Sequence, residues 1–215
     1  MLAADNLTFR YWGGKPPVLA NASIKVAPGE VVGLVGPSGS GKSTLAKLLA
    51  GYLAPQDGQV LLDELPLPRH GLCPVQLLFQ TPELAVNPRW KIHEILSEMH
   101  GSRRSRWSAL GIRDAWLDRF PHELSGGELQ RVCIARSLGP GVRFLIADEI
   151  SGMLDTITQA EIWQALLAYA SAENIGILAI SHDVKLLERI AQRLAALENG
   201  STREVSIEIA GPGSG

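Results

Sequence analysis

The sequence has few of the features that mark several large classes of protein. Only two cysteines occur in 215 residues, Cys73 and Cys133, and they do not form a CxxC pair. We expect both to be small buried hydrophobic residues, and not a disulfide or a metal site. No apolar run approaches the roughly 18 residues that a membrane-spanning helix needs. The first residues also lack the basic flank and apolar stretch of a signal peptide.

The sequence also lacks an excess of positive charge. Its 20 Lys and Arg residues are balanced by 22 Asp and Glu residues, giving a net charge of −2. A domain that binds nucleic acid through the phosphate backbone usually has a basic excess, so we expect no nucleic-acid partner. The hydrophobic fraction of 46% is sufficient for a globular core and argues against intrinsic disorder. We therefore expect a soluble cytoplasmic protein, unless a membrane partner recruits it.

Short apolar strands alternate with helices along the chain. This order is typical of a parallel sheet covered by helices on both faces, and it predicts an α/β fold. The expected strands are Leu7–Tyr11, Ala22–Val26, Val31–Val35, Val60–Asp63, Val75–Phe79, Phe144–Ala147, Gly176–Ile180, Leu194–Leu197 and Glu204–Ile209. The expected helices are Lys42–Ala50, Gly127–Leu138, Thr158–Ala172 and Val184–Ala191.

A segment with a different pattern of apolar residues interrupts this alternation. Ile92, Ile95, Leu96 and Met99 recur at helical spacing, which predicts a small helical subdomain over about residues 81–139. Within it, Arg103–Arg106 is typical of a solvated loop, and a functional basic patch is the alternative. The core then comprises residues 1–80 and 140–210 of a single domain spanning residues 1–210. Residues 211–215 are expected to be a flexible tail.

A glycine-rich loop follows the third expected strand and opens the first expected helix. Its residues match the pattern GxxxxGK[ST], which binds phosphates through backbone N–H groups and the positive end of the helix. Lys42 is expected to reach the β- and γ-phosphates, and the Ser43 hydroxyl is expected to coordinate Mg²⁺. The alternative is a glycine-rich turn with a surface lysine. The candidate nucleotide-binding residues here are Gly36, Pro37, Ser38, Gly39, Ser40, Gly41, Lys42, Ser43 and Thr44.

Two acidic residues, Asp148 and Glu149, directly follow the apolar strand Phe144–Ala147. In an open α/β sheet, ligands bind at the carboxyl ends of strands, the same edge that carries the phosphate loop. Asp148 is therefore a candidate Mg²⁺ ligand acting through water, and Glu149 a candidate base for the attacking water. Without the phosphate loop, two acids at this position would indicate a solvated loop.

A second anion-binding pattern consists of Leu124, Ser125, Gly126, Gly127 and Glu128. It places a serine hydroxyl and two glycines at the start of a helix, where backbone N–H groups lack partners. The segment resembles the LSGGQ signature of ABC ATPases, with glutamate at the fifth position. The resemblance implies that each ATP is bound between the phosphate loop of one subunit and the signature of another.

Other positions match the same family in the expected order. By this resemblance, Tyr11 stacks on adenine and Val18 packs beside the base, although a core or turn tyrosine is an alternative for Tyr11. Gln80 matches the glutamine that contacts Mg²⁺ and communicates with the membrane subunit. Asp155 matches the loop that lines the dimer seam, and His182 matches the histidine that contacts the γ-phosphate.

The resemblance covers roughly residues 2–197 and is closest to the ATPases of peptide and nickel importers. The segments Phe79–Leu84 and Asn87–Trp90 are similar to the FQDP and LNPR elements of that group. The chain departs from the group at Ile150, where proline is usual, and at Gly152-Met153. Its helical subdomain is shorter, and the usual C-terminal extension is missing, which favours metal or another small cargo over peptides.

The family resemblance implies a P-loop NTPase fold with a mostly parallel core sheet, an N-terminal antiparallel β portion and an inserted helical subdomain. It implies an ATPase that uses ATP and Mg²⁺. The expected partners are a second ABC ATPase subunit, integral membrane permeases and, indirectly, a solute-binding protein. The expected location is peripheral, on the cytoplasmic face of the inner membrane. The alternative function is a non-transport ABC ATPase in DNA repair or translation, and a third is an inactive regulatory module.

Overall fold

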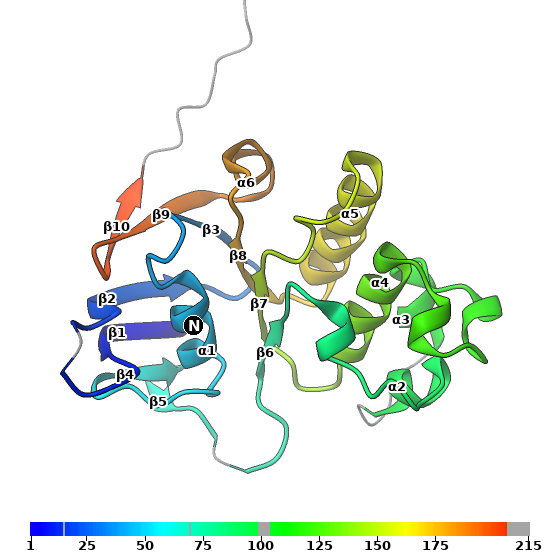
Figure 1. Cartoon of the computed structure of the whole chain (residues 1–215), viewed down its shortest axis with the longest axis horizontal. Coiled ribbons are helices and arrows are strands. Elements are labelled where there is room, and N and C mark those ends of the chain that lie inside the picture. Colours follow the sequence, from blue (N-terminus) through cyan, green and yellow to red (C-terminus); the bar gives the residue numbers. More distant parts are fainter. Residues whose placement is uncertain (15, 69, 99–103, 206–215) are drawn as a thin grey trace, which may run out of the picture.

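The chain folds around two sheets with helices between and beside them (Figure 1). A computed structural model describes residues 1–14, 16–68, 70–98 and 104–205, with backbone alone for residues 104–106. Met99, the predicted strand residues 206–209 and the predicted tail lie outside this part. Among the described residues, no helix is long and apolar enough to cross a membrane.

The N-terminal sheet is antiparallel and has the strand order β2-β1-β4-β5. β1 pairs with β2 on one side and with β4 on the other, so it is an interior strand of this sheet. β5 was not predicted; it pairs with β4 across a turn in which Asp63 and Glu64 both have positive φ. The strands are β1 (Leu2–Phe9), β2 (Leu19–Val26), β4 (Asp57–Leu62) and β5 (Leu65–Pro66).

The larger sheet has the order β10-β9-β3-β8-β7-β6. The five strands from β9 to β6 are parallel, and β10 pairs antiparallel with β9 at one edge. The predicted mostly parallel core sheet is thus present. Its strands are β3 (Val31–Val35), β6 (Val75–Leu78), β7 (Phe144–Asp148), β8 (Gly176–Ile180), β9 (Arg193–Glu198) and β10 (Ser201–Val205).

Alternate residues of the central strands enter two separate hydrophobic cores. Phe144 and Ile146 of β7 belong to the core shared with β1, β2 and α1 (Lys42–Leu49). Leu145 and Ala147 of the same strand belong to the core shared with the helices on the opposite face. This division follows from the two-residue period of a strand, and it explains why β7 is apolar on both faces. Cys133 is buried in the second core, as predicted, whereas Cys73 is half-buried, and both are free thiols.

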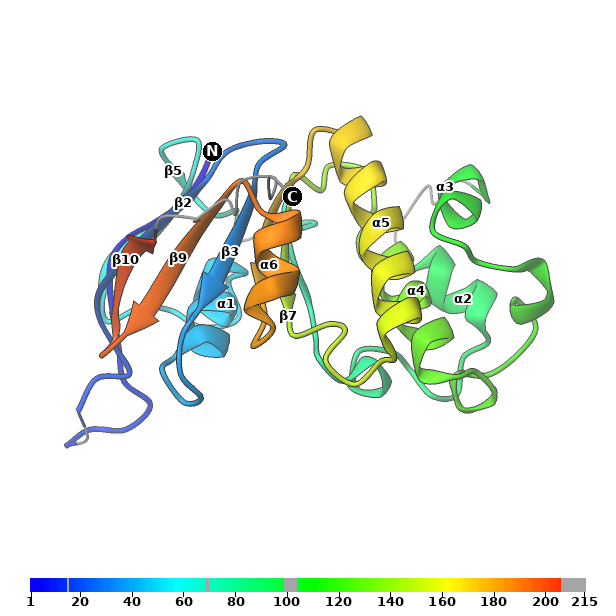
Figure 2. The same cartoon turned by 90° about the horizontal axis from the view of Figure 1, so that it is seen from above.

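Much of the described chain between β6 and β7 is helical and lies beside the large sheet (Figure 2). Ile92, Ile95 and Leu96 are buried, as their spacing predicted. The boundaries 81–139 of a subdomain stay a prediction. The helical elements are η1 (Pro82–Leu84), α2 (Ile92–Ser97), α3 (Arg104–Ala109), η2 (Asp114–Trp116), η3 (Pro121–Glu123) and α4 (Gly126–Ser137). After β7 follow α5 (Thr156–Ala172) and α6 (Val184–Ile190).

Several predicted boundaries were wrong: β2 begins at Leu19 and not Ala22, and β4 spans Asp57–Leu62 and not Val60–Asp63. Three further errors have identifiable reasons. β1 spans Leu2–Phe9 and not Leu7–Tyr11, because pairing on both sides extends it over residues of low strand propensity. β10 begins at Ser201 because Asn199 and Gly200, both with positive φ, form a tight hairpin turn after β9. Arg103–Arg106 was predicted as a loop, but α3 begins at Arg104.

Candidate functional site

The phosphate loop connects β3 to α1, as the sequence predicted. Gly41, directly before the helix, has a φ of 105°, and an added Cβ would lie 3.1 Å from the Val18 carbonyl oxygen. Glycine is therefore required here both for its backbone conformation and for space. The Lys42 ammonium group is buried and donates to the carbonyl oxygens of Gly36 at 2.8 Å and Pro37 at 2.9 Å. These bonds hold the lysine side chain along the inner side of the loop.

Two polar atoms beside this loop are buried without a hydrogen-bond partner among the described residues. They are Oγ of Ser40 and Oδ1 of Asp148. Burial raises the pKa of Asp148, while the Ser43 hydroxyl acts in the opposite direction. A buried polar group without a partner is costly, so both atoms mark positions where a polar ligand would be stabilising.

Glu149 and His182 are brought together by neighbouring parallel strands. Glu149 follows β7, His182 follows β8, and Nε2 of His182 lies 2.6 Å from Oε1 of Glu149. Glu149 has a φ of 53°, which is uncommon for a residue other than glycine. Its backbone N–H donates to the carbonyl of Ile180 at 3.0 Å, which fixes this conformation. Backbone strain of this kind is typical of functional positions.

A cavity of about 320 Å³ joins the loop to these residues. The Tyr11 hydroxyl lies 3.1 Å from Oγ1 of Thr44, and the residue as a whole is 45% exposed beside the cavity. Gln80 is exposed beyond the end of β6 and does not line the cavity, nor do Gly36, Pro37, Ser40 and Asp148. The lining residues are Tyr11, Val18, Ser38, Gly39, Gly41, Lys42, Ser43, Thr44, Glu149 and His182.

The residues predicted to coordinate Mg²⁺ provide oxygen donors. Ser43 offers a hydroxyl, and Oδ1 of Asp148, unpartnered among the described residues, offers a carboxylate oxygen close to it. Such hard donors suit Mg²⁺, which usually retains waters and phosphate oxygens as its other ligands. Within the described residues there is no group of three or more His, Cys, Asp or Glu side chains that could hold a metal alone. The donor set therefore fits Mg²⁺ bound together with phosphates.

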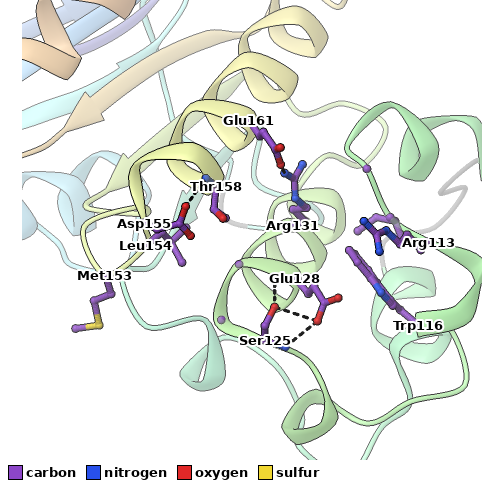
Figure 3. Close-up of a pocket in the computed structure, with 14 residues that line it drawn as sticks. Arg113, Trp116, Ser125, Glu128, Arg131, Met153, Leu154, Asp155, Thr158 and Glu161 are labelled. Atoms are coloured by element: carbon purple, nitrogen blue, oxygen red, sulfur yellow. Dashed lines mark hydrogen bonds and ion pairs between the residues drawn. The ribbon is translucent and has the colours of Figure 1, made fainter.

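A second, larger cavity of about 680 Å³ lies at the start of α4 (Figure 3). Ser125 caps α4, with its Oγ accepting from the N–H of Glu128 at 3.4 Å. Asp155 caps α5 and accepts from the N–H groups of Ile157 at 3.1 Å and Thr158 at 3.0 Å. The hydrogen bonds with Thr158 lower the pKa of Asp155. Four of the five predicted signature residues line this cavity together with Asp155, and Leu124 does not.

The two cavities have no lining residue in common. The phosphate-loop residues and the signature residues are therefore on separate surfaces of one subunit, although the sequence assigned both to ATP. Arg113 and Trp116, which also line the signature cavity, were not predicted as site residues. No local pattern marks them, because they approach the start of α4 only through the fold of the chain.

Comparison with known proteins identifies the family. The family model described as "ABC transporter" matches residues 19–152. The nickel import ATP-binding protein NikE of Rhodospirillum rubrum is 36% identical over 206 residues, which cover 87% of this chain and 74% of that protein. NikE of Escherichia coli is 36% identical over 209 residues, covering 88% of this chain and 78% of that protein.

Solved structures of similar fold include a dimeric bacterial ABC transporter cassette, MJ0796, with a TM-score of 0.80 and 26% identity. That match covers 96% of this chain and 99% of that one. The fold is also similar to CbiO1 from Clostridium perfringens, with a TM-score of 0.80 and 23% identity, covering 94% of this chain and 86% of that one. The chain belongs to the ABC transporter family, as one of its ATP-hydrolysing subunits. The predicted fold class and the resemblance to the nickel and peptide importer group are confirmed.

Proposed function

We propose that this chain hydrolyses ATP at a site completed by a second ABC ATPase subunit, identical or related, and that hydrolysis powers import of a small solute. The observation that supports this is the separation of the two ATP-directed surfaces. Lys42 and Glu149 belong to one cavity and Ser125 to another, so the residues expected to contact one nucleotide do not share a surface within one subunit. A similar cassette forms a dimer in its solved structure, which supports a facing arrangement.

The phosphate-loop cavity would bind the nucleotide. Tyr11 would stack on the adenine, with Val18 beside it, and the backbone N–H groups at the start of α1 would bind phosphate oxygens. Lys42 is held by the Gly36 and Pro37 carbonyls on the inner side of the same loop, from where it would donate to the β- and γ-phosphates. The positive charge and the N–H groups together favour a polyphosphate.

Glu149 and His182 would carry out and support the chemical step. Glu149 would accept a proton from a water that attacks the γ-phosphorus, while the bond to the β–γ bridging oxygen breaks and ADP leaves. His182, 2.6 Å from Glu149, would orient the carboxylate and donate to the γ-phosphate. Ser125 of the second subunit would donate to the same phosphate.

Ser43 and Asp148 would hold Mg²⁺ in this site, and Gln80 would approach it only after moving from its exposed position. When bound, Mg²⁺ supplies positive charge that offsets the charge of the phosphates. The Oδ1 atom of Asp148, which has no partner in the described part of the chain, supports this assignment.

The cargo and the location follow from the relatives. Curated relatives with 36% identity are nickel import proteins, which supports nickel or a similar small solute as cargo and disfavours a role in DNA repair or translation. Import requires permease subunits in the membrane and usually a solute-binding protein. The chain would bind the permeases at the cytoplasmic face of the inner membrane.

The ATPase assignment is tested by Glu149→Gln. Loss of the base should reduce turnover at least about 100-fold. ATP binding should persist, and an ATP-bound dimer should accumulate. Phosphate release, ATP binding and sedimentation measure these three properties. Glu173→Gln, on an exposed residue at the end of α5, should change none of them. Undiminished turnover of the Glu149→Gln variant would exclude this residue as the base.

The cargo is tested separately in cells that lack the chain. Their uptake of labelled nickel should fall and should be restored by the native chain but not by Glu149→Gln. Normal nickel uptake combined with reduced uptake of another solute would show that the cargo assignment is wrong while leaving the ATPase assignment intact.

A further inference from the structure

The polar groups of the signature serine are already engaged in this subunit. Oε2 of Glu128 accepts from the Ser125 N–H at 2.8 Å and from the Ser125 hydroxyl at 3.0 Å (Figure 3). One carboxylate oxygen thus takes both donors with which Ser125 could bind a phosphate. Hydrogen bonds with Ser125 lower the pKa of Glu128, so the carboxylate is charged at neutral pH.

A cation in the same cavity has no carboxylate partner in the described part of the chain. Arg113 is held over the ring of Trp116, with its guanidinium carbon 5.7 Å from the ring centroid. It forms no ion pair among the described residues, whereas Arg131 is paired with Glu161 at 2.7 Å. The charges of Arg119 and, to a smaller extent, Arg113 also lower the pKa of Glu128, and of these two cations only Arg113 lines the cavity. In the view of Figure 3, Glu128 lies between Ser125 and the Arg113–Trp116 pair.

We propose that Glu128 is an internal competitor for the signature serine, and that it must exchange Ser125 for Arg113 before Ser125 can bind the γ-phosphate of ATP held by the other subunit. The exchange transfers hydrogen bonds and changes no covalent bond. The inference rests on the proposed function, because it assumes that the signature faces a nucleotide bound elsewhere. It adds an obstacle to dimer closure, the hydrogen bonds between Glu128 and Ser125, and it names Arg113 as the residue that removes this obstacle.

The physical reason is that two anions cannot share the donors of Ser125. A phosphate oxygen and the Glu128 carboxylate would be adjacent like charges at the start of one helix, in a partly enclosed cavity that strengthens their repulsion. Arg113 provides an alternative partner within the same cavity. Its position on the Trp116 ring keeps the guanidinium in place through a contact that the exchange does not have to break.

The experiment uses the full chain carrying Glu149→Gln, so that ATP is bound but not hydrolysed. ATP is titrated while the monomer–dimer equilibrium is followed by sedimentation. Adding Glu128→Gln removes the charge but keeps a side chain that can complete the same capping interaction. The ATP concentration at half-maximal dimer should fall about tenfold, because charge-assisted hydrogen bonds no longer compete.

Glu123→Gln is the matched control. Glu123 lies in the same segment, and its Oε2 accepts from the Phe120 N–H at 2.7 Å, but it forms no hydrogen bond with Ser125 among the described residues. Its substitution also removes one negative charge, and the ATP midpoint should not change. An equal decrease with Glu123→Gln would show a general effect of charge and would overturn the inference, as would no decrease with Glu128→Gln.

Arg113→Ala tests the second half of the exchange. It should raise the ATP midpoint when Glu128 is present and should have no effect when Glu128→Gln is present. An equal effect in both backgrounds would mean that Arg113 acts independently of Glu128, which overturns the exchange. If no ATP-driven dimer forms in the Glu149→Gln background at all, the composite site of the proposed function fails, and the inference fails with it.

Discussion

Asp148 is a single residue at which stability and function have opposite requirements. Its surroundings bury the carboxylate, leave Oδ1 without a partner among the described residues and raise its pKa. Burial and the missing partner both make the charged form unfavourable in the folded protein, and the raised pKa is the result. The arrangement is explicable if a cation binds there during ATP hydrolysis, because the cation would supply the missing interaction.

We therefore expect Asp148→Asn to stabilise the protein while reducing ATP hydrolysis. Replacing the buried charge by a neutral amide should raise the free energy of unfolding at neutral pH by about 1 kcal/mol. Urea unfolding and phosphate release measure the two effects. Asp118→Asn, at a side chain that is 88% exposed, should change the free energy of unfolding by less than about 0.5 kcal/mol. A lower free energy of unfolding for Asp148→Asn than for the native chain would contradict this account of the site.

Helices α4 and α5 approach each other closely at the signature, which gives Gly127 a structural role. A Cβ added to Gly127 would lie 2.6 Å from Cγ2 of Thr158, on the first turn of α5. A Cβ on the neighbouring Gly126 would find its nearest atom, Cδ2 of Leu154, at 4.0 Å. Of the two adjacent glycines, only Gly127 is therefore required for the packing of the helices.

We expect Gly127→Ala to destabilise the protein by about 1–3 kcal/mol, because the short, branched Thr158 side chain cannot move aside without displacing a helix. Gly126→Ala should leave stability unchanged or raise it, since alanine favours the helix. Chemical unfolding of the two variants provides the comparison. Equal stabilities would show that the α4–α5 contact adapts freely.

The molecule as a whole depends on contacts between its antiparallel and parallel sheets. Asp63 lies in the turn after β4, and its Oδ2 is 2.5 Å from Nη1 of Arg143, which directly precedes β7. Asp63 also pairs with the Met1 amino group. The Arg143 guanidinium is the main cause that lowers the pKa of Asp63 to about 2. The ion pair thus joins a turn of the antiparallel sheet to the parallel sheet.

This pair predicts a pH dependence of stability. Because the folded pKa is lowered, the contribution of Asp63 is complete above the unfolded pKa near 3.8 and is lost as pH falls toward 2. Asp63→Asn should therefore modestly lower the urea midpoint equally at pH 7 and pH 5, and less at pH 3. Asp57→Asn, at the other end of β4 and without an ion pair among the described residues, should show no such pattern. A constant difference down to pH 3 would contradict the assignment.

Strands with strong local patterns were predictable, and those defined by pairing were not. Val31–Val35 and Gly176–Ile180 are short apolar runs between turns, and the structure gives both with the predicted bounds. The first half of β1 contains Ala3, Ala4 and Asp5, which have little intrinsic strand preference. Hydrogen bonds from β2 and β4 hold these residues extended, and such partners are distant in the sequence.

The motif residues of the phosphate loop, the strand-end acids and the signature could be recognised directly from the sequence, because each motif combines unusual residue types at short fixed spacing. The family followed from their order. Their separation into two cavities, the 2.6 Å contact between Glu149 and His182, and the engagement of Ser125 by Glu128 depended on the tertiary structure. Spacing along a chain specifies local geometry, but which surfaces meet and which side chains already have partners is set by packing between elements far apart in sequence. Gln80 illustrates the same limit, since its position after β6 was predictable and its distance from the cavity was not.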